Sequence, residues 1–241
     1  AEEAAYKLVL LRHGESQWNL EKRFTGWSDI DLTDKGRAGA VKAGEIMKGA
    51  GVNFDEVHTS KLNRAIETAQ LAQKGMSAQW VPLQKFWRLN ERCYGDLAGK
   101  KREDVAKEVG DDQVKIWRRS FDVPPPSLAV TDARSPVKDP RYADLDPRVI
   151  PASESLKDVI ARVGPYWTDQ LRPAIKSGKT VLVVGHSTNL RALSAWIEPN
   201  LDEKALQKLE IKNTKPILYE FDKNMNVICR KVLEPSTVKK E

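Results

Sequence analysis

Short apolar runs that alternate with amphipathic helical patterns constrain this fold more than any other feature of the sequence. The clearest run, residues 181–184, has four apolar side chains before a glycine, as in a buried strand. Further strands are predicted at 6–11, 54–60, 80–87, 216–222 and 226–232. Helices are predicted over 33–47, 61–73 and 154–175 and from about Asn189. This order predicts an α/β fold with three layers, in which helices cover both faces of a mostly parallel sheet.

Two hydroxyl residues and one proline-rich stretch set further boundaries. Thr33 and Ser60 are predicted as helix N-caps, because their side chains can accept hydrogen bonds from free amides of the first turn. Residues 121–152 contain the stretch DVPPPS and several further prolines, so we predict a long irregular insertion there. Otherwise we expect one domain over 1–241, with a short tail at 233–241.

The composition limits the class of protein. An apolar fraction of 40% with 31% charged residues indicates a globular chain. The net charge of +6 comes from basic residues mixed with acids and lacks an aromatic-basic stripe, so we expect an anionic small substrate and no nucleic acid. No apolar run approaches the roughly 20 residues of a membrane span, and no signal peptide is evident. Cys93 and Cys229 form no disulfide framework or metal spacing, so the expected location is cytoplasmic.

Two of the three histidines directly follow predicted strands. His13 follows the strand over 6–11, and His186 follows the strand over 181–184. Ligands of open α/β sheets bind beyond the carboxyl ends of the strands, so these two residues are predicted to form a site. His58 has no arginine beside it and is predicted to be structural.

The residue types around these histidines indicate phosphoryl chemistry. The sequence has no G-x-S-x-G elbow, no H-E-x-x-H zinc motif and no G-x-x-x-x-G-K-[ST] phosphate loop. Histidine can itself act as a nucleophile, and arginine binds phosphate oxygens in pairs. Arg12 and Arg64 are the candidate phosphate ligands, and Glu91 is the candidate donor of a proton to the leaving oxygen.

Several motifs resemble one family over most of the chain. They are LLRHGESQWN, FTGWSDIDLT, TSKLNRAIETA, RLNERCYGDLAGK and QVKIWRRSFDVPPP, followed by the late strand that ends in His186. The RHG motif is typical of the histidine phosphatase superfamily. The NERxYG and WRRSFDVPPP signatures resemble the cofactor-dependent phosphoglycerate mutases within it.

The resemblance implies an enzyme of glycolysis and gluconeogenesis that interconverts 3- and 2-phosphoglycerate. His13 would be the phosphorylated nucleophile, primed by 2,3-bisphosphoglycerate and needing no metal. Arg12, Arg64 and His186 would hold the transferred group, and Glu91 would act as acid and base. The implied substrate-binding residues are Ser16, Asn19, Thr25, Gly26, Arg92, Tyr94, Arg102, Arg118, Arg119, Ser187 and Thr188. Members of the family often form dimers or tetramers, so a homo-oligomer without membrane or nucleic-acid partners is expected.

The sequence also departs from the family pattern. Ser187 and Thr188 stand where Gly-Asn is usual, and Arg102 stands where lysine is usual. Residues 212–216, KNTKP, replace a Pro-Thr-Gly-Ile-Pro pattern, and the tail is shorter than usual. In the family the tail typically closes over the site, and a less complete closure would admit water to a phosphohistidine. Two alternatives to the mutase therefore stay open. One is a histidine-type phosphatase or bisphosphoglycerate-processing enzyme acting on a small phosphorylated metabolite, and the other is a non-catalytic binder of phosphorylated ligands.

Overall fold

A six-stranded sheet forms the centre of the molecule, which a computed structural model describes for residues 3–236. The order of the strands is β3-β2-β4-β1-β5-β6. The first four strands in this order run parallel. Strand β5 is antiparallel to β1, and β6 is antiparallel to β5, so β6 again has the direction of the first four. The predicted α/β class with a mostly parallel sheet is confirmed. The bounds are β1 Tyr6–Arg12, β2 Glu56–Thr59, β3 Leu83–Lys85, β4 Val181–Gly185, β5 Ile217–Phe221 and β6 Val227–Val232.

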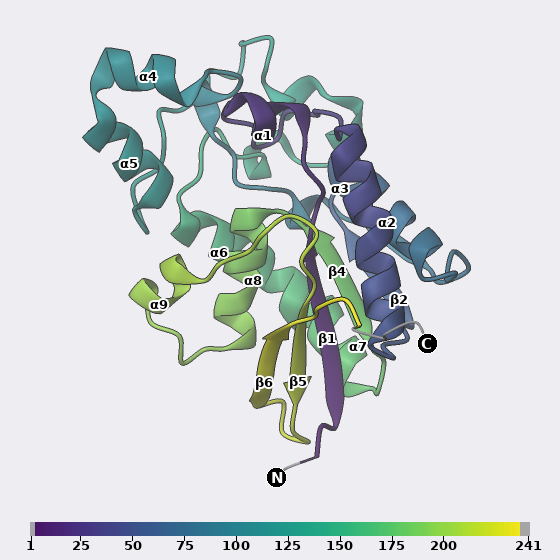
Figure 1. Ribbon diagram of the computed structural model, residues 1–241. Coiled ribbons are helices and arrows are strands. Elements are labelled where there is room, and N and C mark those ends of the chain that lie inside the picture. Colours follow the sequence, from purple (N-terminus) through teal and green to yellow (C-terminus); the bar gives the residue numbers. More distant parts are fainter. Residues whose placement is uncertain (1–2, 237–241) are drawn as a thin grey trace.

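Helices cover both faces of the sheet, as predicted (Figure 1). The helices α2 (Asp34–Gly49) and α3 (Asn63–Gly75) pack on one face, against Val9 and Leu11 of β1. Leu8 and Leu10 point to the opposite face because side chains alternate along a strand. That face is covered by α6 (Leu156–Tyr166), α7 (Arg172–Lys176), α8 (Ser187–Ile197) and α9 (Glu203–Lys208).

The caps and lengths of several elements differ from the prediction. Thr33 is confirmed as the N-cap of α2, since its side chain accepts from the Gly36 amide. Ser60 is wrong as a cap, because α3 begins at Asn63 and Leu62 occupies the N-cap position. The third strand is only three residues long, and its exposed edge position gives it little burial. Helix α8 begins at Ser187, two residues before the predicted Asn189, because His186 keeps an extended backbone as the N-cap.

The helix predicted over 154–175 is one continuous helical stretch made of three segments. Ser155 caps α6, a π-helical turn spans Trp167–Leu171, and α7 continues to Lys176. Pro173 lacks the amide hydrogen that an α-helix would donate four residues back, so the regular pattern cannot continue unbroken. The wider turn absorbs this defect without ending the helix.

The elements beyond the carboxyl ends of the strands position the site. The insertion over 121–152 is mostly irregular, as predicted, and includes 3₁₀ turns at Pro136–Lys138, Pro140–Tyr142 and Pro147–Val149. Three helices beyond the same end of the sheet were not predicted from the sequence (Figure 1). They are α1 (Gln17–Glu21), α4 (Arg102–Val109) and α5 (Asp111–Arg119). The predicted tail is described only as far as Ser236. Within residues 3–236, no helix combines the length and apolar character that crossing a membrane requires.

Candidate active site

Two buried histidines meet at the carboxyl ends of neighbouring parallel strands. Strand β1 pairs with β4 up to Arg12 opposite Gly185, so His13 and His186 follow the two strands side by side. Their ring centroids are 5.1 Å apart, and both side chains are buried. The predicted meeting of the two histidines is confirmed.

The hydrogen bond of His13 leaves its outer nitrogen free to react. Nδ1 lies 2.6 Å from the carbonyl oxygen of Gly14. A carbonyl oxygen only accepts, so Nδ1 carries the hydrogen and Nε2 keeps its lone pair. Burial, and then the positive charges of Arg64 and Arg12, holds the pKa of His13 well below 6.5. The imidazole is therefore neutral at physiological pH, which is the state that a nucleophile requires.

Close backbone packing fixes the loop that carries His13. A Cβ on Gly14 would lie 2.3 Å from the carbonyl oxygen of Gly36, so only glycine fits where the loop crosses the start of α2. The Gly14 amide also donates to the Thr68 hydroxyl of α3 at 3.1 Å. Both contacts hold the Gly14 carbonyl in the position that orients the His13 ring.

His186 is oriented by a residue that the sequence analysis assigned to another role. Its Nε2 lies 2.8 Å from the Ser60 hydroxyl, and its backbone amide donates to Oδ1 of Asn189. Burial, with Arg64 as the next cause, holds the pKa of His186 well below 6.5. Ser60 therefore positions the second histidine, and no local sequence signal links residues 60 and 186.

Arg12 and Arg64 bring positive charge to the histidine pair. Arg64 is 2% exposed, and its Nη1 and Nη2 donate to the carbonyls of Ser28 and Gly26. Burial lowers its pKa to about 10, so it remains charged at neutral pH. Nη1 of Arg12 donates to the Ile211 carbonyl, and its Nε has no partner among the described residues.

Glu91 is held by backbone amides at the start of α8. Its Oε1 accepts from the amides of Asn189 and Arg92 at 3.0 and 2.8 Å, and its Oε2 accepts from the Thr188 amide at 3.2 Å. The free amides of a first helical turn attract a carboxylate. The helix that follows His186 thus fixes the predicted acid at the same cavity.

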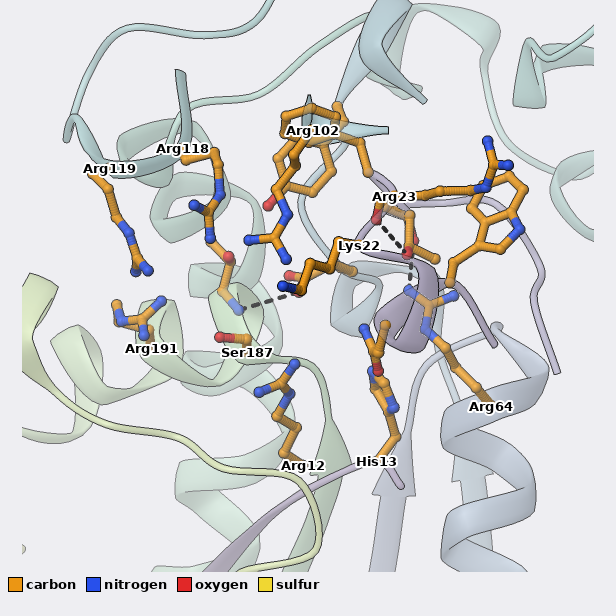
Figure 2. Close-up of a pocket in the computed structure, with 18 residues that line it drawn as sticks. Arg12, His13, Lys22, Arg23, Arg64, Arg102, Arg118, Arg119, Ser187 and Arg191 are labelled. Carbon is orange, nitrogen blue, oxygen red and sulfur yellow. Dashed lines mark hydrogen bonds between the residues drawn. The ribbon is translucent and has the colours of Figure 1, made fainter. Parts of the chain in front are cut away.

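One cavity of about 310 Å³ collects these groups together with an excess of cations. Arginines from α5 and α8 face it from the side opposite Arg64, and Arg102 of α4 lies between the two sides (Figure 2). Its cationic lining residues are Arg12, Lys22, Arg23, Arg64, Arg102, Arg118, Arg119 and Arg191, and its acidic lining residue is Glu91. Within the described part of the chain, Arg23 is the single one of these cations in an ion pair, with Glu21. The cavity is therefore suited to a ligand that carries several negative charges.

The structure brings most of the predicted site residues to this cavity. Four of the five predicted catalytic residues line the cavity, and the fifth, His186, is fully buried behind it. The predicted substrate-binding residues in the wall are Asn19, Thr25, Gly26, Tyr94, Arg102, Arg118, Arg119, Ser187 and Thr188. Ser16 lies outside the wall, because it is fully buried as the N-cap of α1 and accepts from the Asn19 amide. Arg92 is also 2% exposed and donates to the carbonyls of Glu154 and Trp117, so it stands behind the wall.

Several residues of the wall were not predicted from the sequence. Trp18 and Phe24 supply apolar surface, and Lys22, Arg23 and Arg191 supply charge. Arg191 stands four residues after Ser187, so helical spacing from Ser187 could have indicated it. Lys22 had no such signal, because its left-handed backbone (φ 56°) at the end of α1 turns it toward the cavity.

Neither the third histidine nor the buried cysteine belongs to this site. His58 bonds the Tyr166 hydroxyl and Glu56 at the buried side of β2, so the structural prediction for it is confirmed. Burial raises the pKa of Cys93 to about 12, so it is a thiol at neutral pH. Across residues 3–236, no cluster of three or more histidine, cysteine or acidic side chains has metal-binding geometry.

Acid is expected to destabilise the protein through the two site histidines. Their folded pKa values lie well below 6.5, so the unfolded chain binds more protons once the pH falls below about 6.5. Each histidine adds a slope of at most about 1.4 kcal/mol per pH unit, so stability should fall steadily as the pH drops below about 6.5. Urea unfolding across pH 5–8 measures this, and His13→Asn should remove about half of the slope. A flat profile below pH 6.5 would contradict neutral burial of the pair.

The fold and the site together define an α/β protein whose histidines and arginines meet at a cavity with a large excess of positive charge. The chain matches the Histidine phosphatase superfamily (branch 1) over residues 8–136 and 129–232, and it belongs to this family. Members of this superfamily catalyse phosphoryl transfer or phosphate-ester hydrolysis.

Several solved structures share the fold. An alpha-ribazole phosphatase from Shigella flexneri is 21% identical, with a TM-score of 0.70, 97% of this chain covered and 100% of the other. A mycobacterial glucosyl-3-phosphoglycerate phosphatase is 22% identical, with a TM-score of 0.71 and coverage of 97% and 100%. A phosphoglycerate mutase from Bacillus anthracis is 22% identical, with a TM-score of 0.65 and coverage of 96% and 92%. At these identities the likeness concerns the fold, which serves both phosphatases and a mutase.

Proposed function

We propose that the chain moves a phosphoryl group from a small, multiply anionic metabolite onto His13 and then onto water. The observation that carries this proposal is the neutral His13 ring, whose Nδ1 is bonded to Gly14 and whose Nε2 is free beside two arginines. A binding protein would have no need of a nucleophile fixed in this way.

In the first step, Nε2 of His13 attacks phosphorus and the bond to the leaving oxygen breaks. Arg12 and Arg64 offset the charge on the phosphoryl oxygens, and the buried His186 lies beside the transferred group. Glu91 lies at the same cavity and, when protonated, gives its proton to the leaving oxygen. In the second step, Glu91 takes a proton from water as the water oxygen attacks phosphorus. Inorganic phosphate leaves, and His13 returns to its neutral form.

Two observations favour water as the acceptor. Fold relatives described as phosphatases act on an alpha-ribazole phosphate and on glucosyl-3-phosphoglycerate. Ser187 and Thr188 also replace the Gly-Asn pair of the mutases at the start of α8, beside Glu91. Ser187 adds a side chain and Thr188 has a shorter hydroxyl in place of an amide, so both change the contact with a substrate phosphate, while the nucleophile and acid are kept.

A phosphoglycerate mutase is the second candidate, and the cation excess of the cavity favours it. Seven of the eight cationic wall residues form no ion pair within the described part of the chain, so two phosphates can be accommodated at once. The NERxYG and WRRSFDVPPP motifs support the same reaction. A bisphosphorylated primer such as 2,3-bisphosphoglycerate would supply the phosphoryl group that His13 carries.

Phosphorus NMR separates these reactions. The protein is incubated with 3-phosphoglycerate, with and without a trace of 2,3-bisphosphoglycerate. Release of inorganic phosphate is the expected result for a phosphatase, and primer-dependent 2-phosphoglycerate identifies a mutase. If neither appears, a panel of other phosphorylated metabolites is tested for acid-labile phosphate on the protein. Failure of every donor to label His13 would overturn the proposal.

A further inference from the structure

The segment that leads into β5 crosses the carboxyl end of β1, next to the nucleophile (Figure 1). It comprises residues 209–216, and its Asn213 forms an isolated parallel bridge with Arg12, the last residue of β1. The Thr214 amide donates to the Arg12 carbonyl at 2.9 Å, and the Ile211 carbonyl accepts from Nη1 of Arg12 at 3.0 Å. The segment therefore extends the sheet at the point where the site begins.

The side chain of Asn213 bonds the backbone of the nucleophile itself. Its Nδ2 donates to the His13 carbonyl at 2.7 Å, and no other donor to this oxygen lies among the described residues. The nitrogen of the same peptide unit, the Gly14 amide, donates to the Thr68 hydroxyl at 3.1 Å. The peptide unit that joins His13 to Gly14 is thus held at its oxygen and at its nitrogen, by elements far apart in the sequence.

This peptide unit controls the direction of the His13 ring. Nδ1 of the ring is bonded to the Gly14 carbonyl, and rotation of the peptide unit before Gly14 would carry that carbonyl away. Glycine restricts its own backbone torsions little, so hydrogen bonds have to fix the orientation. His13 is 3% exposed, and an unpaired buried carbonyl is unfavourable. Without the Asn213 amide, the loop would turn until the His13 carbonyl found another donor.

The backbone of the segment is strained at the residue after Asn213. Thr214 has a φ of 53°, in the left-handed region that β-branched residues rarely adopt. In this conformation its amide reaches the Arg12 carbonyl, and its hydroxyl donates to the Asn213 carbonyl at 2.8 Å. Strain of this kind persists only where the surroundings hold it, and it is concentrated at functional sites. It is a second observation that favours a functional role for this turn.

We propose that Asn213 is a positioning residue for His13, which keeps Nδ1 of the ring on the Gly14 carbonyl and Nε2 free to react. This inference rests on the proposed function, because a reacting nucleophile requires one ring direction. Asn213 does not line the cavity, so it acts through the backbone of His13. Its loss should lower kcat about 10- to 100-fold, since a misplacement of about 1 Å can cost 100-fold. KM should change less than about threefold, because the residues of the cavity wall are all kept.

Nitrogen NMR of protein labelled in its three histidines tests the ring direction in Asn213→Ala. The matched control is Asn226→Ala, which removes a side-chain amide at the other end of β5, where Nδ2 donates to Asp222. The signals of His13 are identified by their loss in His13→Ala. In the wild type and the control, His13 should show one neutral form, with its hydrogen on Nδ1. In Asn213→Ala the hydrogen should be shared between the two ring nitrogens, while the signals of His58 stay unchanged.

Turnover of the same proteins separates this inference from the proposed function. A loss of kcat in Asn213→Ala with KM nearly kept, and wild-type values in Asn226→Ala, is the expected result. The NMR measurement needs no substrate, so a changed His13 ring in a protein that no donor phosphorylates would refute the reaction and keep the positioning role. If Asn213→Ala does not fold, Asn213→Asp replaces it, because aspartate keeps the shape and lacks the amide donor. An unchanged His13 ring in the folded variant would overturn the inference.

Discussion

His13→Ala is expected to lower kcat by roughly 10⁴- to 10⁶-fold, the loss that accompanies removal of a catalytic histidine. The alanine has no lone pair to attack phosphorus, and the arginine-lined cavity that remains can still bind substrate. The fold should survive, because the loop is held by the Gly14 amide at Thr68 and by its packing on Gly36, and not by the imidazole. Turnover of the substrate found by phosphorus NMR, together with acid-labile phosphate on the protein, measures the effect.

His58→Gln is the matched control for this prediction. His58 is equally buried and belongs to the same sheet, but it contacts Tyr166 and Glu56 away from the cavity. This variant should lose stability and keep kcat per folded molecule. Retention of more than about one tenth of the activity by His13→Ala would exclude the phosphohistidine route.

The sequence predicted those elements of the fold whose burial leaves a periodic pattern. Strand β4 is buried along its whole length, so its apolar run was unambiguous. Helices α4 and α5 escaped prediction because each buries a single side chain, Val105 and Val114, and neither has an apolar stripe. The third strand was predicted too long, because Trp80 and Phe86 are apolar but exposed outside the strand.

The residues of the site also divide into those that the sequence could predict and those that it could not. His13, His186 and Arg12 follow from strand ends, so their meeting could be predicted from topology. The bond between Ser60 and His186 joins residues far apart in sequence, and it requires the register of β2 against β4. Arg92 has a motif position typical of a ligand contact, but its side chain turns into the protein to hold the Glu154 carbonyl. Side-chain direction at a loop has no periodic signal, so the sequence could not reveal it.

The largest expected effect on stability comes from a buried ion pair behind Glu91. Arg162 and Glu154 are 7% and 3% exposed, with Nε and Oε2 2.7 Å apart. Arg162 also donates to the carbonyls of Arg88, Asn90 and Glu91, so it fixes the segment that carries the predicted acid. Arg162→Met would leave Glu154 as a buried charge without its partner. The free energy of unfolding should fall by roughly 3–5 kcal/mol.

Urea unfolding of Arg162→Met, of Glu154→Leu and of the double variant Arg162→Met/Glu154→Leu measures this effect. The double variant should be less destabilised than the sum of the two single changes, because it leaves no unpaired charge. Arg148→Met is the control, since Arg148 pairs with Asp146 at the surface and should leave the free energy of unfolding almost unchanged. At temperatures where Arg162→Met stays folded, kcat should also fall, because the Glu91 backbone loses one of its donors. Equal stability of Arg162→Met and wild type would mean that backbone amides alone hold Glu91 in place.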